Sequence, residues 1–368
     1  MPKIANGRPN LFDFATSELS QDAFICWLVS WADAKFEKTN ADLYNVSRKF
    51  LARLADLEDI SKHAKIEVMR QYKNIDILVS VENISDEKNY LILIEDKTST
   101  RDHGGQLNRY YSKIFKETQG DDQKHLDWRV KPIYFFTGDE GNANRVKQSG
   151  YTPFNRKKFL KILRQGKNIK NEIFRDFTDR LEIIESRTLA YKTTPLKEWT
   201  YHNWQGFFWA LCENLNETNK FNETGEGADF FHVPNQGGGF LACVFPLIPK
   251  TWSLNRGDES KRDIYCQLEA RRSSNADTYF PNFTVRLATD SKNETQAFRG
   301  EIRPELRKVF NGHSYKQANR LGKSTCVLIF DDIFQIKDDG KIDFDKTMDS
   351  ITNLRSTAKQ LSEFEPSH

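Results

Sequence analysis

Cysteine, long apolar runs and an excess of one charge sign are all scarce in this sequence. The 368 residues include five cysteines, which are far apart and form no Cys-x-x-Cys pair. We therefore expect neither a zinc site built from cysteines nor a disulfide framework. No segment approaches about 18 uninterrupted apolar residues, and the first residues lack the apolar core of a signal peptide. We expect a cytoplasmic protein with no membrane partner.

The charge balance excludes a polybasic binder. Lys and Arg together number 55 against 52 acidic residues, which leaves a formal net charge of +3. Any surface for nucleic acid must therefore come from local clustering of charge. Hydrophobic residues at 38% and aromatic residues at 12% indicate a globular chain and not a disordered one. The length exceeds one typical domain, so we expect two.

Two short aliphatic runs carry acidic residues that a buried strand normally avoids. The first run, residues 73–79, contains Asp76, and the second, residues 90–97, ends in Glu95-Asp96-Lys97. Side chains alternate along a strand, so Glu95 and Lys97 share one face. If the first run pairs antiparallel with the second, the carboxylates meet at one end of the sheet. They would repel one another unless a cation held them, and oxygen ligands of this kind suit Mg²⁺ or Mn²⁺.

This arrangement carries a resemblance to a known family. Asp76, then eighteen residues, then Glu95-x-Lys97 resembles the signature of the PD-(D/E)XK nuclease superfamily. The first half of the motif departs from the usual pattern, because Ile75 stands where proline is common. Nine residues after Lys97 comes Gln106-Leu-Asn-Arg-Tyr110, which is similar to the Q-x-x-x-Y element of RecB-like and lambda-exonuclease-like members.

The resemblance implies a Mg²⁺- or Mn²⁺-dependent nuclease that hydrolyses phosphodiester bonds, and we expect DNA as its substrate. Asp76 and Glu95 would ligate the metal, with the backbone carbonyl of Asp96 as a further oxygen ligand. Lys97 would position the attacking water or help to deprotonate it, and would offset charge in the transition state. In this superfamily an acidic residue on the helix before the sheet often joins the metal site, which here is Glu18. The alternative is that Glu18 only favours the positive end of the helix dipole.

Gln106 and Tyr110 are the remaining residues to which the resemblance assigns a role. They are four residues apart on an expected helix, and therefore on one face of it. From that face they would hold the site or the strand that is cut.

The order of expected elements in the first half matches the αβββαβ core that the resemblance implies. We expect an α/β, restriction-endonuclease-like domain over residues 1–192 with a mixed central sheet. Helices are expected from about Glu18, at about 41–57 and at about 106–118. Strands are expected near 65–72, around Asp76, around Glu95 and at 131–137, with a polar hairpin loop at 83–89.

The second half of the chain has a different pattern of expected helices and strands. We interpret residues 191–195 as a linker and residues 195–368 as an α+β domain that serves substrate recognition or oligomerisation. Short strands are expected at 239–247, 263–269, 282–288 and 325–334, and a helix closes the chain. This half contains no catalytic grouping of residues that we recognise.

Residues 156–175 contain eight basic residues and one acidic residue, interleaved with apolar ones. A surface that follows a phosphate backbone has this composition, because each phosphate that is neutralised releases counterions. We take Lys157, Lys158, Lys161 and Arg164 as the expected nucleic-acid contacts. The alternative is a helix face exposed only to water.

Several classes of function stay open. A catalytically degenerate nucleic-acid-binding protein would keep the basic segment and lose a ligand, whereas Asp76, Glu95 and Lys97 are all present here. A structural or interaction protein has no need to align these three residues. Within the nucleases, a restriction-type endonuclease, a DNA-repair exonuclease and an effector of phage defence share the same core. The chain would act as a homo-oligomer or with separate partner proteins in some of these settings.

Overall fold

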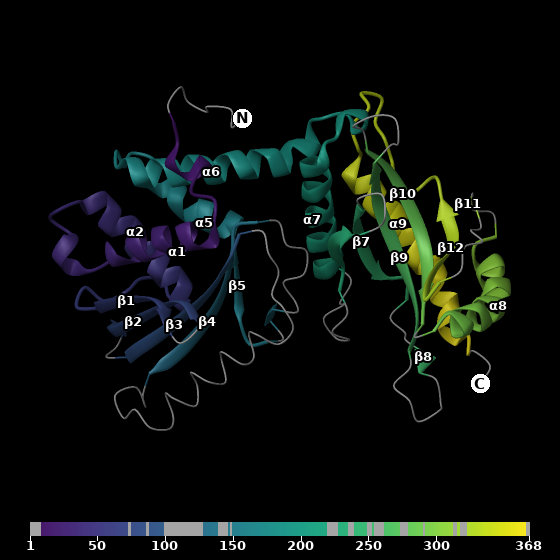
Figure 1. Cartoon of the computed structure of the whole chain (residues 1–368), viewed down its shortest axis with the longest axis horizontal. Coiled ribbons are helices and arrows are strands. Elements are labelled where there is room, and N and C mark those ends of the chain that lie inside the picture. Colours follow the sequence, from purple (N-terminus) through teal and green to yellow (C-terminus); the bar gives the residue numbers. More distant parts are fainter. Residues whose placement is uncertain are drawn as a thin grey trace. The chain divides into compact units, whose positions relative to one another are not determined.

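The chain forms two compact units, Met1–Ser186 and Arg187–His368 (Figure 1). The computed structural model describes residues 9–72, 75–85, 88–98, 128–138, 146–147, 149–218, 227–234, 239–248, 252–253, 261–272, 279–289, 291–311, 315–316 and 322–365. The expected helix at 106–118, with Gln106 and Tyr110, lies outside these residues. Among the helices within them, none combines the length and apolar character needed to cross a bilayer.

The first unit is built on a mixed sheet of five described strands in the order β1-β2-β3-β4-β5. The first three strands pair antiparallel, whereas β4 runs parallel to β3 and β5 runs parallel to β4. The prediction of an α/β domain with a mixed sheet is confirmed. The strand bounds are β1 (Lys65–Tyr72), β2 (Ile75–Ser85), β3 (Lys88–Lys97), β4 (Arg129–Phe136) and β5 (Thr152–Asn155).

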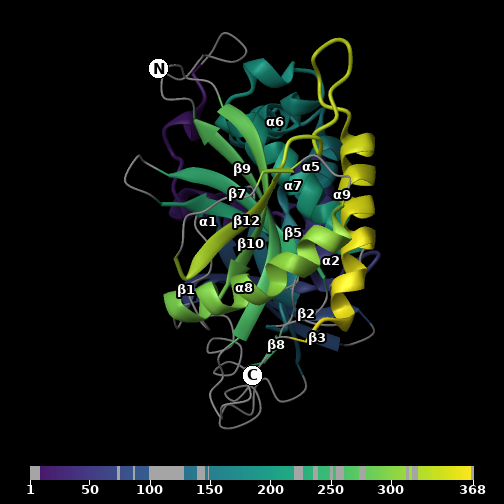
Figure 2. The ribbon, with the colours of Figure 1, turned by 90° about the vertical axis from the view of Figure 1, so that its right-hand side faces the viewer.

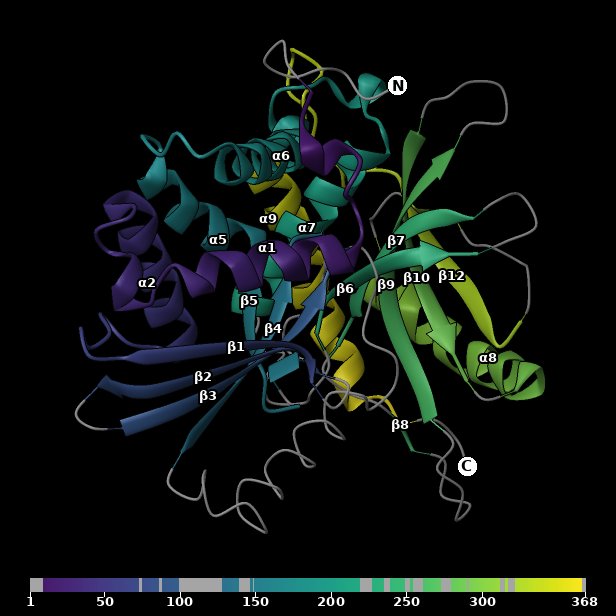
Figure 3. The ribbon, with the colours of Figure 1, turned by 60° about the vertical axis from the view of Figure 1, so that its left-hand side comes forward.

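Four helices of the first unit share one core with this sheet (Figure 3). They are α1 (Glu18–Ser30), α2 (Ala41–Ala55), α5 (Arg156–Leu163) and α6 (Glu172–Leu189). The side chains of Ser17, Asn40 and Asn155 accept hydrogen bonds from the first turns of α1, α2 and α5 and so cap these helices. The core between helices and sheet is rich in aromatic rings.

The two faces of β3 carry different apolar clusters, and this alternation positions the polar residues at the end of the strand. Ile92 and Ile94 belong to the core shared with the helices. Leu91 and Leu93 belong to a smaller cluster on the opposite face. Because side chains alternate, the side chain at position 96 continues the helix side, and those at positions 95 and 97 continue the other.

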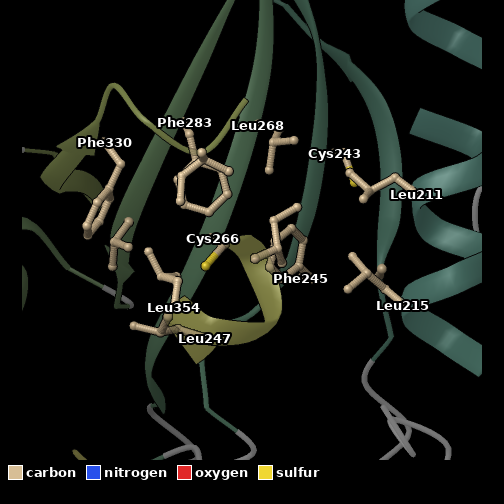
Figure 4. Packing of buried hydrophobic residues seen from close by; sticks show 14 of the residues in the cluster. Leu211, Leu215, Cys243, Phe245, Leu247, Cys266, Leu268, Phe283, Phe330 and Leu354 are labelled. Carbon is tan, nitrogen blue, oxygen red and sulfur yellow. The ribbon is translucent and has the colours of Figure 1, made fainter. Parts of the chain in front are cut away.

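The second unit is an antiparallel sheet with three described helices on it (Figure 2). Its strand order is β11-β12-β10-β9-β7-β6, and β8 pairs with β9 outside this order. Figure 4 shows part of its core, where Cys266, Phe283 and Leu354 pack together. The element bounds are α7 (Tyr201–Thr218), β6 (Asp229–Val233), β7 (Phe240–Pro246), β8 (Trp252–Ser253), β9 (Lys261–Arg272), β10 (Tyr279–Ala288), α8 (Lys292–Val309), β11 (Tyr315–Lys316), β12 (Ser324–Phe330) and α9 (Phe344–Ala358).

The interpretation of residues 191–195 as a linker is wrong. Tyr191 is only 3% exposed and belongs to the core of the second unit. Its ring centroid lies 6.0 Å from that of Trp199 and 5.8 Å from that of Phe207. The aromatic side chain of Tyr191 has a large apolar area to bury and holds the segment against the core.

The close packing of α7 predicts that one glycine there is indispensable. A Cβ added at Gly206 would lie 1.7 Å from the carbonyl oxygen of Thr188, whereas one added at Gly300 in α8 would meet nothing within 4 Å. We expect Gly206→Ala to lower the free energy of unfolding by roughly 1–3 kcal/mol or more, because the helix must shift. Gly300→Ala should raise it by about 0.8–1 kcal/mol through helix propensity.

Thermal and urea unfolding of both variants beside the wild type measures this contrast. The same stability in the two variants would show that the α7 backbone does not approach Thr188 so closely in solution.

Candidate active site at the ends of β2 and β3

The pairing of β2 with β3 brings Asp76, Glu95 and Lys97 together. Ile77 faces Ile94 in the antiparallel register, so the preceding residue of β2 lies opposite Glu95. The Lys97 Nζ atom donates hydrogen bonds to Glu95 Oε1 at 2.8 Å and to the Asp96 carbonyl oxygen at 2.9 Å. It also lies 3.8 Å from Asp76 Oδ2. One ammonium group therefore stands among three oxygen atoms from two strands.

The Lys97 ammonium is buried together with its partner. Glu95 is 3% exposed and Lys97 is 7% exposed. Burial by itself would lower the pKa of Lys97, but the hydrogen bond and the charge of Glu95, with further help from Asp76, raise the pKa above its ordinary value. Lys97 is thus a cation, and its charge compensates the carboxylates around it.

Asp76 is held from two sides. Its Oδ2 atom accepts a hydrogen bond from the Asp96 backbone N–H at 2.8 Å. Burial raises the pKa of Asp76, the Asp96 N–H and the Lys97 charge act to lower it, and the charge of Glu18 raises it again, with a net rise. Partial burial beside another carboxylate therefore makes the charged form of Asp76 costly, and a further cation would relieve that cost.

The oxygen atoms around the Lys97 ammonium suit a divalent metal ion. Carboxylate and carbonyl oxygens are the ligands that Mg²⁺ and Mn²⁺ prefer, and the ammonium stands where their lone pairs converge. Among the described residues, no group of three His, Cys, Asp or Glu side chains is arranged to hold a metal ion. The Asp96 main-chain carbonyl, 2.9 Å from the Lys97 ammonium, is a further oxygen atom at this point.

Glu18 lies beside this group of residues. It is the first residue of α1, and its Oε1 atom accepts a hydrogen bond from the Thr98 backbone N–H at 3.4 Å, directly after the end of β3. Its charge contributes to the raised pKa of Asp76. The first turn of α1 therefore faces the same end of the sheet as the carboxylates.

Two further polar residues of α1 face β3, and sequence reasoning missed both. The Gln21 Nε2 atom donates to Asp96 Oδ1 at 2.5 Å. Asp22 is 2% exposed, and burial, followed by the charge of Asp76, raises its pKa to about 6. Burial and the proximity of Asp22 hold the pKa of Asp96 well above its usual range, against the effect of Gln21. A signal was present, because Glu18, Gln21 and Asp22 share one face of a helix whose other positions are largely apolar.

The basic segment that follows β5 is divided between surface and interior. Lys157, Lys158 and Lys161 are exposed on α5. Arg164 is also exposed, but its guanidinium binds both carboxylate oxygens of Glu182, at 2.7 and 2.8 Å. Arg156, the first of the eight basic residues, is 0% exposed, so it does not belong to any surface. Composition alone cannot separate it from the exposed lysines beside it.

Comparison with known proteins confirms the family resemblance. Residues 9–188 match the family model of the PD-(D/E)XK nuclease superfamily. No curated protein and no solved structure matches the chain. The matched region covers nearly all of the first unit and includes Asp76, Glu95 and Lys97.

The buried acidic pair predicts that the protein without metal loses stability as the pH rises. The pKa of Asp22 in the folded protein is about 6, against an ordinary value of 3.8, so the folded chain keeps a proton that the unfolded chain releases. The free energy of unfolding should fall between about pH 4 and pH 6 and stay lower above that window. Asp22→Asn removes this group and should raise Tm at pH 7.5, by roughly 2–4 °C for each kcal/mol gained.

The measurement is a thermal unfolding series from pH 4 to pH 8 in EDTA, with Asp42→Asn as the control at an exposed acidic residue of α2. A gain in Tm that is as large at pH 4 as at pH 7.5 would contradict the raised pKa.

Proposed function

Residues 9–188 of this chain belong to the PD-(D/E)XK nuclease superfamily, and from this premise we propose a metal-dependent nuclease that hydrolyses phosphodiester bonds in DNA. The observation that carries the proposal is the contact of the Lys97 ammonium with Glu95, 2.8 Å away, and with the Asp96 carbonyl, 2.9 Å away, beside Asp76. A fold does not need a buried lysine between a buried and a partly buried carboxylate at a strand end. Their assembly is costly unless it serves chemistry.

Each residue of the group has a distinct role in the proposed reaction. Asp76 and Glu95 would hold Mg²⁺ or Mn²⁺, together with the Asp96 carbonyl, and Glu18 would add a carboxylate from α1. A bound ion of this kind would lower the pKa of a water molecule and stabilise negative charge on the phosphate. Lys97, displaced from the carboxylates, would direct its ammonium toward the phosphate and the attacking water. Its positive charge would offset the charge that develops in the transition state.

The proposal extends to the remaining expected residues. We infer a restriction-endonuclease-like core in the first unit, in which Gln106 and Tyr110 act from the helix that the sequence predicts at 106–118. Lys157, Lys158 and Lys161 would contact the DNA backbone, and Arg164 would do so on leaving Glu182. The second unit would recognise the substrate or join copies of the chain, and phage defence and DNA repair are the two settings that we propose.

A catalytically degenerate DNA-binding protein is the alternative. Such a protein would lack a ligand or the lysine of the core, whereas Asp76, Glu95 and Lys97 are all present and the Lys97 ammonium lies 3.8 Å from the first carboxylate and 2.8 Å from the second. This complete set favours activity.

The decisive experiment incubates the purified protein with plasmid, linear DNA, single-stranded DNA and RNA, in Mg²⁺, in Mn²⁺ and in EDTA. We expect cleavage of at least one DNA substrate that requires the divalent ion. Binding of DNA without cleavage of any substrate in either metal would favour the degenerate alternative.

Lys97→Met should abolish cleavage, because it keeps most of the side-chain volume and removes the ammonium that acts on the transition state. The variant should also melt at a lower temperature in EDTA, because buried Glu95 is deprived of its counter-ion, at a cost of roughly 3–5 kcal/mol in buried pairs. Mn²⁺ should restore part of that stability.

Lys62→Ala, at an exposed lysine of the first unit, is the matched control. The comparison uses single-turnover cleavage rates and Tm. A Lys97→Met rate within about threefold of the Lys62→Ala rate would remove Lys97 from the mechanism.

The exposed lysines of α5 should contribute to binding and hardly to chemistry. Replacing Lys157, Lys158 and Lys161 by Ala should flatten the slope of log affinity against log salt, by roughly 0.9 for each phosphate of duplex DNA that is no longer neutralised. The single-turnover rate at saturating protein should stay near that of the wild type.

The control removes three exposed lysines from other parts of the first unit, Lys35, Lys38 and Lys62. If salt titrations of DNA binding give the same slope for both triple variants, the α5 lysines do not contact DNA phosphates.

A further inference from the structure

A continuous chain of buried polar side chains lies behind the candidate active site, and the proposed reaction does not use it. It runs Glu185–Arg156–Thr137–Gln21–Asp96, and no member is more than 7% exposed. The Arg156 guanidinium donates to Glu185 Oε2 at 2.8 Å and to the Thr137 carbonyl oxygen at 2.5 Å. The Thr137 hydroxyl donates to Gln21 Oε1, and Gln21 Nε2 donates to Asp96 Oδ1.

This chain of hydrogen-bonded side chains is a costly way to stabilise a protein core. Apolar residues of similar volume often replace a buried ion pair with no loss of stability, or with a gain. A hydrogen-bonded chain differs from apolar packing in being directional, because each group must meet its partner at one distance and angle. The chain therefore specifies the relative placement of the elements that it joins.

The chain of hydrogen-bonded side chains joins the elements that meet at the candidate active site. Gln21 belongs to α1, Asp96 to β3, Arg156 to α5 and Glu185 to α6, and Thr137 directly follows β4. Gln21 connects β3 with the end of β4, and both ends of its amide group are engaged. Three residues earlier on the same helix face stands Glu18.

The Asp96 end of the chain is attached directly to the reacting groups. The Asp96 side chain points to Gln21, while its main-chain N–H binds Asp76 and its main-chain carbonyl binds Lys97. These three groups share one Cα atom, so a shift of the β3 main chain at Asp96 would break the hydrogen bond from Gln21. The hydrogen bond from Gln21 therefore constrains the positions of Asp76 and Lys97 from the opposite face of the sheet.

We propose that Gln21 and Arg156 are positioning residues of this site. Gln21 holds the Asp96 main chain and the first turn of α1 in one geometry, and Arg156 holds Gln21 in turn through Thr137. The inference rests on the proposed nuclease function for its chemical meaning, but the positioning itself is a property of the protein without metal or substrate.

The test uses Gln21→Leu, which keeps volume and removes the side-chain hydrogen bonds of Gln21, and the double variant Arg156→Met/Glu185→Gln, which removes both charges of this ion pair together. Ile25→Val, in the core on the same helix, is the control for simple destabilisation and should cost roughly 0.5–1.5 kcal/mol. Arg156→Lys is the conservative variant, which keeps the charge beside Glu185 and should recover part of the function.

Two readouts separate positioning from stability. The first is the hydrogen-exchange rate of the Asp96 backbone amide in EDTA, which should rise in Gln21→Leu and in the double variant above the rate in Ile25→Val. The second is Mn²⁺ affinity by calorimetry, which should fall by roughly 10–100-fold, the usual effect of removing a residue that orients a metal ligand. Cleavage should show a lower kcat with KM for DNA unchanged.

The outcomes distinguish the two proposals. An Asp96 amide and a Mn²⁺ affinity that both match those of Ile25→Val would overturn the positioning role. If the wild type cleaves no nucleic acid and binds no Mn²⁺, the proposed nuclease function fails, and the Asp96 exchange rate still decides whether Gln21 and Arg156 position that segment.

Discussion

The contact between the Lys97 ammonium and the oxygens around it is the constraint on which the rest of the first unit depends. Glu95 is 3% exposed, and burying an ionised carboxylate is costly unless a cation or hydrogen-bond donors compensate its charge. The lysine two residues later supplies that cation because alternate residues of a strand share a face. Asp76 reaches the same point only because β2 pairs antiparallel with β3. Strand register and charge compensation therefore depend on each other.

This constraint accounts for the polar residues elsewhere in the unit. Asp96, between Glu95 and Lys97, must point to the opposite face and so into the core beneath α1. A carboxyl group there needs a donor, which Gln21 provides, while burial and the neighbouring Asp22 raise the pKa of Asp96. The unit thus holds carboxyl groups on both faces of one strand end. Such crowding disfavours the charged forms of Asp22, Asp76 and Asp96.

The second unit is stabilised mainly by apolar packing. Its described helices share one large apolar core with the sheet, which includes Trp199, Trp204 and Phe207. The tryptophan side chains are at most 6% exposed at positions 199, 204 and 209, so they serve packing. Glu269 is an exception, because it is 0% exposed and accepts hydrogen bonds from Gln267 and Asn282. The contrast between a polar site in one unit and an apolar scaffold in the other agrees with the family match to residues 9–188.

The sequence by itself indicated β1 to β4, the alternation of side chains along β3, and the identity of Asp76, Glu95 and Lys97, because a period of two in an aliphatic run reports which residues share a face. It did not indicate β5, a strand of four residues. Only the tertiary structure decided what each face meets. It placed Gln21 against Asp96 from 75 positions away, and it buried Arg156 while leaving Lys157 exposed. It also placed Tyr191 in the hydrophobic core of the second unit. The physical reason is that local periodicity carries no information on the partner of a face, and the cost of burying a charge depends wholly on that partner.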